Sequence, residues 1–578
     1  MSKPLLQLEL KHSLLHIVQL CLYTIAADIL IAECVFVFER ALSWYILPFS
    51  FLIGIIFLMI FYGEEPGKRM IFEIIIIIAL FIFLAGLCGK IYDTSYDGNA
   101  YHKVAVGLLK NHWNPIKQPA GDMLVKILRE DRCAIWVECY AKGAWILAAG
   151  VYGMTGNIEC GKVYTFLSML CAFCLTCYCM RRKKKGILFS VAFSLIVALN
   201  PVALAQMTTF YVDGYLHSML YILVLTLIML SGMGEKRKER IAFASLLACA
   251  MVICGTIKFT GLLYGGIYCI AYFLYYSYQQ VRIGNGQGRS NIWKCFCWFV
   301  LLAAVTVFWA GADTYVMNTL RHGSPVYPLY GEGAIDIMTA NSPFGKVNHI
   351  KNFLISIFSK MENVIFANGG VPELKIPFVV DWEREFGALG VPDMRISGFG
   401  IFFSGIFLVA GCAILIQLFN AHMRRKQVGN ALKIHFLLLL VAVNMCLCLV
   451  IAESWWARYA PYIYFTALIG IFFFLDSSHQ GRSKKPWIAL KTIFCAVLLA
   501  NSLIFTMRLP DAWRYSRLIH NKISALSAYH NVEVETQRYL GIYFNFEDLR
   551  VHYTPTVNLT PNGMGTAFPF KDIQIYVK

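Results

Sequence analysis

Long runs of apolar residues constrain the fold of this chain more than any other feature. A helix that crosses a bilayer needs roughly 20 mostly apolar residues, and about thirteen segments of the sequence meet that requirement. They lie near residues 14–37, 42–62, 70–90, 161–180, 187–205, 209–231, 241–257, 259–277, 292–311, 398–420, 434–452, 459–475 and 487–506. We therefore expect an all-α polytopic membrane protein with about thirteen transmembrane helices.

The composition excludes a soluble enzyme. Of the 578 residues, 58% are hydrophobic and 15% are charged, whereas soluble domains average roughly 45–50% apolar and about 25% charged residues. The net charge of +17 would suggest a nucleic-acid partner in a soluble protein. Here the positive residues cluster in short loops between apolar runs, so they are topology signals and no nucleic-acid partner is expected. The 19 cysteines lie largely in apolar runs, where a free cysteine behaves as a small apolar residue.

The basic loops predict the orientation of the chain. Clusters of Lys and Arg occur at 181–185, 236–240, 424–426 and 482–485. All four fall on one side if thirteen spans are counted from a cytoplasmic N-terminus. We therefore predict a multi-pass protein of the cell membrane whose larger polar segments and C-terminus lie on the outer face.

The same count divides the chain into three parts. Residues 1–69 are expected to form an N-terminal membrane hairpin, and 70–506 a transmembrane core with outer loops 91–160 and 312–397. Residues 507–578 are expected to form a small mixed outer appendage.

One apolar stretch, 133–153, is interpreted as a helix lying at the membrane interface, since counting it as a span would reverse the basic loops. Its expected interfacial anchors are Trp136, Tyr140 and Trp145.

Two carboxylates, Asp93 and Asp97, follow the third span within a few residues of its end. A carboxylate at a boundary between hydrocarbon and water is partly desolvated, which raises its basicity and suits a general base acting on a hydroxyl. The alternative is structural: the two acids could instead cap a helix that begins near Asn99, because Asp is a favoured N-cap residue.

The stretch 96–115 resembles the first outer loop of GT-C membrane glycosyltransferases, enzymes that take a sugar from a polyprenyl-phosphate-linked donor. Many bacterial members carry an Asp, a small residue and Tyr-His after an early span, with a Trp and Asn-Pro further on. The matching residues here are Asp97, Gly98, Tyr101, His102, Trp113, Asn114 and Pro115. The resemblance covers most of 70–506 and implies a GT-C-like fold with Asp97 as the catalytic base and Asp93 as a second candidate. Typical members place this loop after span one, so its position after span three suggests an added N-terminal hairpin.

Further loose motifs follow in the same order along the chain. They are TTFYVDGYLHS (208–218), KFTGLLYG (258–265), HGSPVYPLYG (322–331, with Ser324 where the family has Asn), DMRISGFG (393–400) and ESWWARYAPY (453–462). The resemblance implies a cation near the donor phosphate, for which Arg458 is the first choice, followed by Arg395 and Lys258. The residues expected to contact substrate are Tyr101, His102, Trp113, Asp213, Glu453 and Tyr459. The structural alternatives are snorkelling for Arg458 and a helix end for Lys258.

The expected reaction is an inverting transfer of a hexosyl or related group to an acceptor hydroxyl on a cell-wall polymer, a lipid-linked oligosaccharide or a protein. No metal ligand is assigned, although a divalent cation (Mg²⁺ or Mn²⁺) is compatible with Asp93, Asp97 and His102 as hard or borderline ligands.

Three other functions stay open. A polysaccharide polymerase or ligase would use lipid-linked glycan and outer-loop arginines, here Arg321, Arg384 and Arg395. A flippase or transporter would show repeated halves or several charges within the membrane. The third is a purely structural membrane subunit.

Overall fold

The computed structural model covers the whole chain, and its placement can be described for most residues. The described residues are 3–62, 67–232, 237–283, 287–336, 342–344, 348–363, 371–423, 428–477, 484–536, 538–556, 565–567 and 574–576.

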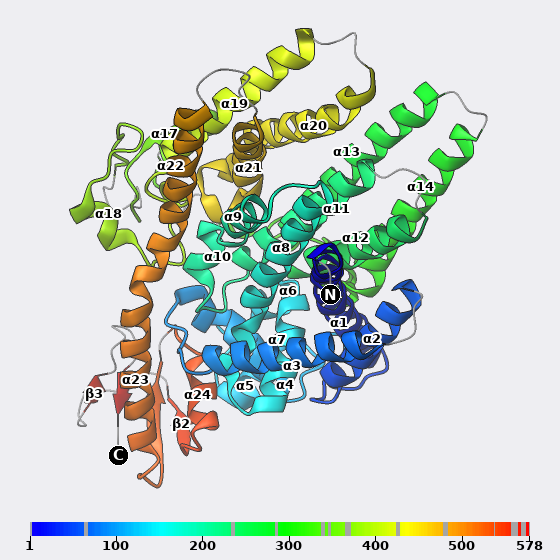
Figure 1. The fold of residues 1–578 in the computed structure, drawn as a ribbon. Coiled ribbons are helices and arrows are strands. Elements are labelled where there is room, and N and C mark those ends of the chain that lie inside the picture. Colours follow the sequence, from blue (N-terminus) through cyan, green and yellow to red (C-terminus); the bar gives the residue numbers. More distant parts are fainter. Residues whose placement is uncertain are drawn as a thin grey trace.

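Among these residues, nine helical segments are long and apolar enough to cross a membrane (Figure 1). They are built on α1 (Lys3–Val37), α3 (Lys68–Cys88), α8 (Val163–Arg182), α11 (Asp213–Ser231), α12 (Arg237–Ile257), α13 (Phe259–Ile283), α14 (Gly288–Ala304), α19 (Phe403–Met423) and α22 (Lys484–Leu503). The other four expected spans coincide with α2 (Ile46–Tyr62), α9 (Ile187–Ala198), α20 (Val428–Val450) and α21 (Pro461–Asp476). Each expected span is thus helical, as an all-α polytopic protein requires.

The span expected over 187–205 is broken into two helices. The helix α9 ends at Ala198, and α10 (Pro201–Gln206) begins after Asn200, whose side-chain oxygen accepts the Val202 amide at 2.9 Å. Proline at the first helical position disfavours helical geometry in the residue before it, so the chain turns there.

The stretch 133–153 forms α6 (Ala134–Cys139) and α7 (Gly143–Thr155). Trp145 is fully buried, and Tyr140 stacks on it with ring centroids 5.4 Å apart. The prediction that these two residues anchor a lipid-facing helix is therefore wrong. The reason is that α7 packs against α4 (Lys103–Lys110) and the 3₁₀ turn η2 (Ile158–Lys162).

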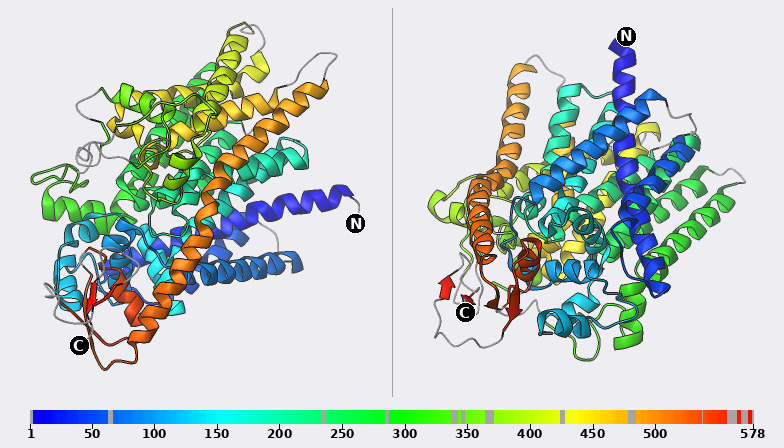
Figure 2. Two further views of the ribbon diagram at one scale, coloured as in Figure 1. Left: turned by 90° about the vertical axis from the view of Figure 1, so that its left-hand side faces the viewer. Right: turned by 90° about the horizontal axis from the view of Figure 1, so that it is seen from below.

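The basic loops and the acidic motifs lie at opposite ends of the helices. Arg182 pairs with Glu239, Lys185 pairs with Asp476, and Lys491 Nζ donates to the carbonyl of Leu475 at 2.6 Å, so these chain segments meet at one end. Of the four clusters, Lys236, Arg424, Arg425, Lys426 and Arg482 lie outside the described residues. The N-terminus and the C-terminal strands also lie at opposite ends of the molecule (Figure 2). Which end is cytoplasmic stays a prediction.

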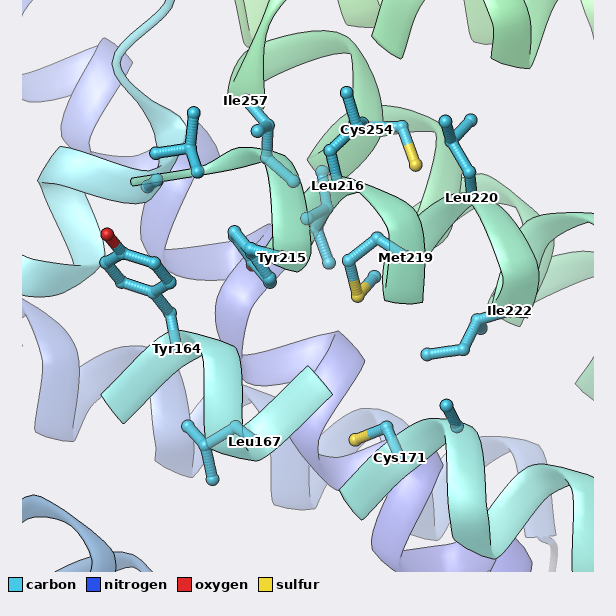
Figure 3. Close-up of a cluster of buried hydrophobic side chains, with 14 of the residues drawn as sticks. Tyr164, Leu167, Cys171, Tyr215, Leu216, Met219, Leu220, Ile222, Cys254 and Ile257 are labelled. Atoms are coloured by element: carbon cyan, nitrogen blue, oxygen red, sulfur yellow. The ribbon is translucent and has the colours of Figure 1, made fainter. Parts of the chain in front are cut away.

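The centre of the bundle is packed from α8, α11 and α12 (Figure 3). The labelled side chains are Tyr164, Leu167 and Cys171 of α8, Tyr215, Leu216, Met219, Leu220 and Ile222 of α11, and Cys254 and Ile257 of α12. Lipid tails are as apolar as these side chains, so close van der Waals packing holds the helices together. This packing fixes Asp213 at the first turn of α11.

The first helix belongs to the same bundle. Most of the residues in the apolar part of α1 are buried, and the helix packs against α2, α8 and α12. It is therefore part of the packed bundle, and its pairing with α2 is compatible with the predicted N-terminal hairpin.

The remaining elements lie in the connecting segments and at the C-terminus. The short helices are α5 (Ala120–Leu128), α15 (Met317–His322), α17 (His349–Phe358), α18 (Trp382–Ala388) and α24 (Ile542–Asp548), and the 18-residue α23 (Leu509–Leu526) follows α22. The strands are β1 (Val532–Glu535), β2 (Tyr553–Pro555), β3 (Gly565–Ala567) and β4 (Gln574–Tyr576), in the sheet order β2-β1-β4-β3. In this sheet β1 is parallel to β2 and antiparallel to β4.

The C-terminal segment packs on the loop that follows Asp97. The Gly541 amide donates to the carbonyl of Asn99 at 2.7 Å, and Lys103 Nζ donates to Asn545 at 3.1 Å and to Glu159 at 2.6 Å. Lys103 and Glu159 are both fully buried. The expected appendage is thus joined to the core through a buried ionic cluster.

Gly107 allows this close approach, because a Cβ at that position would collide with the ring of Phe544. We expect Gly107→Ala to lower the free energy of unfolding by about 1–3 kcal/mol, the usual cost of overpacking. Thermal unfolding in detergent, together with protease sensitivity of the C-terminal segment, measures this. Gly121→Ala is the matched control, since its Cβ would lie 3.8 Å from Ala134; equal destabilisation of the two variants would contradict the contact.

Burial raises the pKa of Asp548 to about 7, although the Tyr152 hydroxyl and the Ile158 amide both donate to this carboxylate. The folded state therefore holds the proton more tightly than the unfolded state, so the stabilisation is complete below about pH 4 and is lost as pH rises through about 7. We expect α24 to exchange its amide hydrogens faster at pH 8 than at pH 6, after correction for intrinsic rates. Asp548→Asn should flatten this dependence, and an unchanged profile in that variant would contradict the assignment.

Candidate functional site

One guanidinium gathers three carboxylates at the end of the bundle opposite the basic loops. Arg458 Nη1 donates to Asp393 Oδ1 at 2.6 Å and Nη2 donates to Asp97 Oδ2 at 3.0 Å. Its Nε lies 3.0 Å from Asp213 Oδ2. We call Arg458 and these three acids, together with Lys258 and Arg395, the Arg458 cluster.

Four separate parts of the chain deliver the residues around Arg458. Asp97 precedes the π-helical turn η1 (Gly98–His102) after α3, and Asp213 opens α11. Asp393 lies in the loop between α18 and α19. Arg458 itself lies in the short 3₁₀ turn η7 (Ala457–Tyr459), which ends before Pro461 begins α21. The site therefore exists only when the helix ends come together.

The acids differ in their access to solvent. The side chains of Arg458 and Asp213 are 6% and 1% exposed, whereas those of Asp97 and Asp393 are 19% and 21% exposed. Asp213 is thus the buried counter-ion, and Asp97 and Asp393 form the face that another molecule can reach.

The carboxylates of the cluster keep Arg458 in its charged form. Burial acts to lower the pKa of Arg458, but the surrounding carboxylates outweigh it, so the pKa is raised well above its ordinary value and the guanidinium stays charged. Burial raises the pKa of Asp393 in spite of the Arg458 charge beside it.

Lys258 completes the buried side of the cluster. It lies between the end of α12 and the start of α13, and its Nζ donates to Asp213 Oδ1 at 2.6 Å. The break in the helix at this residue explains why a lysine interrupts an apolar stretch. The second oxygen of Asp213 also accepts the Gln206 amide at 3.3 Å.

Aromatic rings enclose the two buried cations. The Arg458 Cζ lies 4.7 Å from the Tyr211 ring centroid and 5.0 Å from that of Tyr459, while Lys258 Nζ lies 4.0 Å from the Tyr459 ring. Trp456 lies 5.4 Å from both Arg458 and Arg395. Such rings attract cations and exclude water, which strengthens the ion pairs inside.

The second aspartate candidate does not face the cluster. Asp93 is fully buried; its Oδ1 accepts the Ser95 amide and its Oδ2 accepts the Phe210 amide, each at 2.7 Å. These bonds use both oxygens to fix the backbone, so Asp93 is a structural carboxylate. Of the two acids predicted after the third span, Asp97 is the one that reaches Arg458.

The other predicted substrate contacts divide in the same way. His102 is buried and its Nδ1 accepts the Trp145 indole N–H at 2.9 Å, and the fully buried Trp113 donates to the Gln118 carbonyl at 3.0 Å. Both are structural. Tyr101 is half-buried, and its ring centroid lies 4.3 Å from that of His102 beside the cluster.

Glu453 opens the 3₁₀ turn η6 (Ala452–Trp455), and its carboxylate makes none of the described contacts of the Arg458 cluster.

Asp393 is the site residue that the sequence analysis missed. The motif over 393–400 was singled out for Arg395, whose Nη2 lies 3.6 Å from Asp393 and whose Nη1 donates to Asn363 at 2.7 Å. The acid two positions before this arginine is the signal that was available. Tyr211, two residues before Asp213, was likewise not selected.

The ligand set considered for a divalent cation does not converge. Asp93 and His102 are engaged with Ser95, Phe210 and Trp145, and Asp97 is paired with Arg458. In the part of the chain that the structure describes, no group of three or more His, Cys, Asp or Glu side chains is placed to hold a metal ion.

Comparisons with protein-family models, with curated proteins and with solved structures find no match to this chain.

Removing the central cation should be costly. We expect Arg458→Met to lower the free energy of unfolding by about 3–5 kcal/mol, because it leaves Asp213 buried beside Lys258 alone. Lys117→Met is the control: Lys117 pairs with Glu39 and the two side chains are 58% and 69% exposed, so its loss should cost at most about 1 kcal/mol. Denaturant titration in detergent compares the two variants, and similar losses would contradict the central role of Arg458.

Proposed function

We propose that this protein is a membrane glycosyltransferase that moves a sugar from a polyprenyl-phosphate-linked donor to an acceptor hydroxyl, with Asp97 as the general base. The observation that carries the proposal is the contact between Asp97 and Arg458 at the end of the membrane helices. It joins a partly exposed carboxylate and a phosphate-binding type of cation at one point, and both residues match the loops that resemble GT-C enzymes.

Asp97 is suited to take a proton. Its Oδ2 is the atom paired with Arg458, so Oδ1 is available to accept a hydrogen bond from a hydroxyl. The acceptor proton passes to Asp97 as the acceptor oxygen forms its bond to the anomeric carbon. The bond from that carbon to the phosphate oxygen breaks, and its electron pair leaves with the lipid phosphate. One such displacement inverts the anomeric centre.

Arg458 has a double role in this proposal. Each of its guanidinium nitrogens already faces a carboxylate, so a donor phosphate binds there by competing with the two outer acids, Asp97 and Asp393. A phosphate that takes the place of Asp97 removes that acid from its ion pair, which makes the carboxylate a stronger base only when the donor is present. The guanidinium then stabilises the charge that develops on the leaving phosphate.

Lys258 and Arg395 support the same chemistry from two sides. Lys258 neutralises Asp213 and keeps the buried side of the cluster in place. Arg395 lies beside Asp393 and the Trp456 ring, where its positive charge attracts a phosphate. The proposed acceptor is a glycan, a lipid-linked oligosaccharide or a protein on the outer face, and the bilayer delivers the donor.

A transporter of lipid-linked glycan is the second candidate, and buried acids within a span are the observation that favours it. Asp28 and Glu33 of α1 are both buried, and Glu33 accepts the Asp313 amide at 3.3 Å. Charged residues inside membrane segments often mark transport pathways. A polymerase or ligase has less support, because Arg321 pairs with Glu138 and Arg384 with Glu362, away from Arg458.

Asp97→Asn tests the proposal. We expect transfer of radiolabelled sugar from a polyprenyl-phosphate donor to fall by about 10²–10⁴-fold, the usual contribution of a general base. Asp511→Asn is the matched control, since that aspartate is exposed, pairs with Arg508 and lies outside the cluster. Both variants should express at the wild-type level; the amide oxygen introduced by Asp97→Asn can still accept from Arg458, so its melting temperature should fall only slightly, and that of Asp511→Asn should be unchanged.

The contradicting outcome is full transfer activity in the Asp97→Asn protein. If wild-type vesicles instead moved the labelled lipid across the bilayer without forming a glycoside, the transporter would replace the enzyme.

A further inference from the structure

One loop segment exposes an unusual number of apolar side chains. Residues 371–382, sequence VPELKIPFVVDW, follow the first described part of the loop before α19. Six of their apolar side chains are exposed. They are Val371 (71%), Leu374 (63%), Ile376 (72%), Phe378 (42%), Val379 (55%) and Trp382 (56%). We call this set the 371–382 patch.

The charged groups of the segment are engaged with one another and with the loop behind them. Lys360 pairs with Glu373 at 2.7 Å and with Asp381 at 2.9 Å. Lys375 pairs with Glu385, both nearly fully buried. Lys375 and Glu385 are thus buried beneath the segment, whereas Glu373 and Asp381 are 47% and 36% exposed and share Lys360 as their ion-pair partner.

The main chain holds this arrangement in place. The Lys360 amide donates to the Glu373 carbonyl and the Lys375 amide donates to the Phe358 carbonyl, each at 2.8 Å. The exposed apolar side chains therefore stand on a fixed frame, and their exposure does not arise from a lack of local structure. Contiguous apolar patches of this kind mark contact with a partner or a membrane.

The position of the patch indicates that it contacts the membrane and not a protein partner. The Phe378 ring fills the space beside Gly405, in the first turn of α19, and Lys375 Nζ donates to the carbonyl of Ile401 at 2.6 Å, just before that helix. The helix α19 is a candidate membrane span whose own exposed side chains include Leu408 and Leu415. The patch therefore continues a lipid-facing surface at the level where α19 enters the membrane.

We propose that the 371–382 patch is an interfacial anchor that inserts its apolar side chains among the lipid headgroups beside α19. Trp382 supplies the aromatic side chain favoured at that depth, and the charged groups of the segment are neutralised in ion pairs, which lowers the cost of bringing them close to the headgroups. The occupant of the patch is the lipid surface itself.

The anchor is connected to the candidate site. Glu362 and Ile396 exchange main-chain hydrogen bonds, with distances of 3.4 and 3.0 Å, and Ile396 directly follows Arg395 in the loop that carries Asp393. The anchor is therefore linked to that loop through residues 360–362, since Lys360 pairs with Glu373 and Asp381. The proposal rests on these contacts and is independent of the chemistry proposed for Asp97.

Photo-crosslinking of the full chain tests the anchor. A benzophenone amino acid is placed at Ile376, and the purified protein is reconstituted in vesicles of phosphatidylethanolamine and phosphatidylglycerol. Leu415, 65% exposed on α19, is the lipid-facing control, and Tyr529, 49% exposed after α23, is the aqueous control. Mass spectrometry measures the lipid adducts after illumination.

We expect the yield of lipid adduct at Ile376 to be comparable with that at Leu415 and roughly tenfold above that at Tyr529. The same result is expected at Val379. A yield at Ile376 equal to that at Tyr529 would overturn the anchor. An adduct to a second copy of the chain in place of lipid would also overturn it and would identify the patch as an interface between protein molecules. Because both substituted side chains are exposed, unchanged melting temperatures verify that the variants are folded.

Discussion

The buried charge of Arg458 is the constraint on which the arrangement of the helix ends depends. A guanidinium removed from water is stable only when opposite charges meet it with good geometry. Here Asp213 supplies that charge from below, and Asp97 and Asp393 supply it from the accessible side. Because the three acids come from distant parts of the chain, satisfying this one cation brings the loop after α3, the start of α11 and the loop before α19 to a single point.

A second buried ionic cluster supports the Asp97 loop from the other side. Lys103 and Lys162 both pair with Glu159, and Asn545 of the C-terminal segment bonds to Lys103 and to Glu159. The chain from Asp97 to Lys103 is therefore held between the Arg458 cluster and the C-terminal segment. This explains why a segment that looks like an appendage in the sequence shares the core of the membrane bundle. The same contacts fix the position of the loop that carries Asp97.

Much of the candidate site could be predicted from the sequence, and the errors have common physical causes. Asp97, Asp213, Lys258, Arg395 and Arg458 were selected because each falls in a motif that resembles GT-C enzymes, and the structure brings them together. Asp93, His102 and Trp113 come from the same stretch as Asp97, and Trp145 was predicted as an interfacial anchor, but their polar atoms are used inside the protein. Asp393 was missed because it belongs to the site only through its ion pair with Arg458, and Arg458 is 65 residues away in the chain.

The sequence by itself determined which segments form apolar helices long enough to be candidate membrane spans. A helix that crosses a membrane satisfies its own backbone hydrogen bonds, so length and hydrophobicity suffice to locate it. The break after Ala198 also has a local cause in the sequence, namely Asn200 and Pro201. Tertiary structure alone decided which acids surround Arg458, which of the two aspartates after α3 reaches that cation and which loop segment exposes its apolar side chains. These outcomes depend on contacts between residues far apart in the chain, and the type and spacing of neighbouring residues do not encode those contacts.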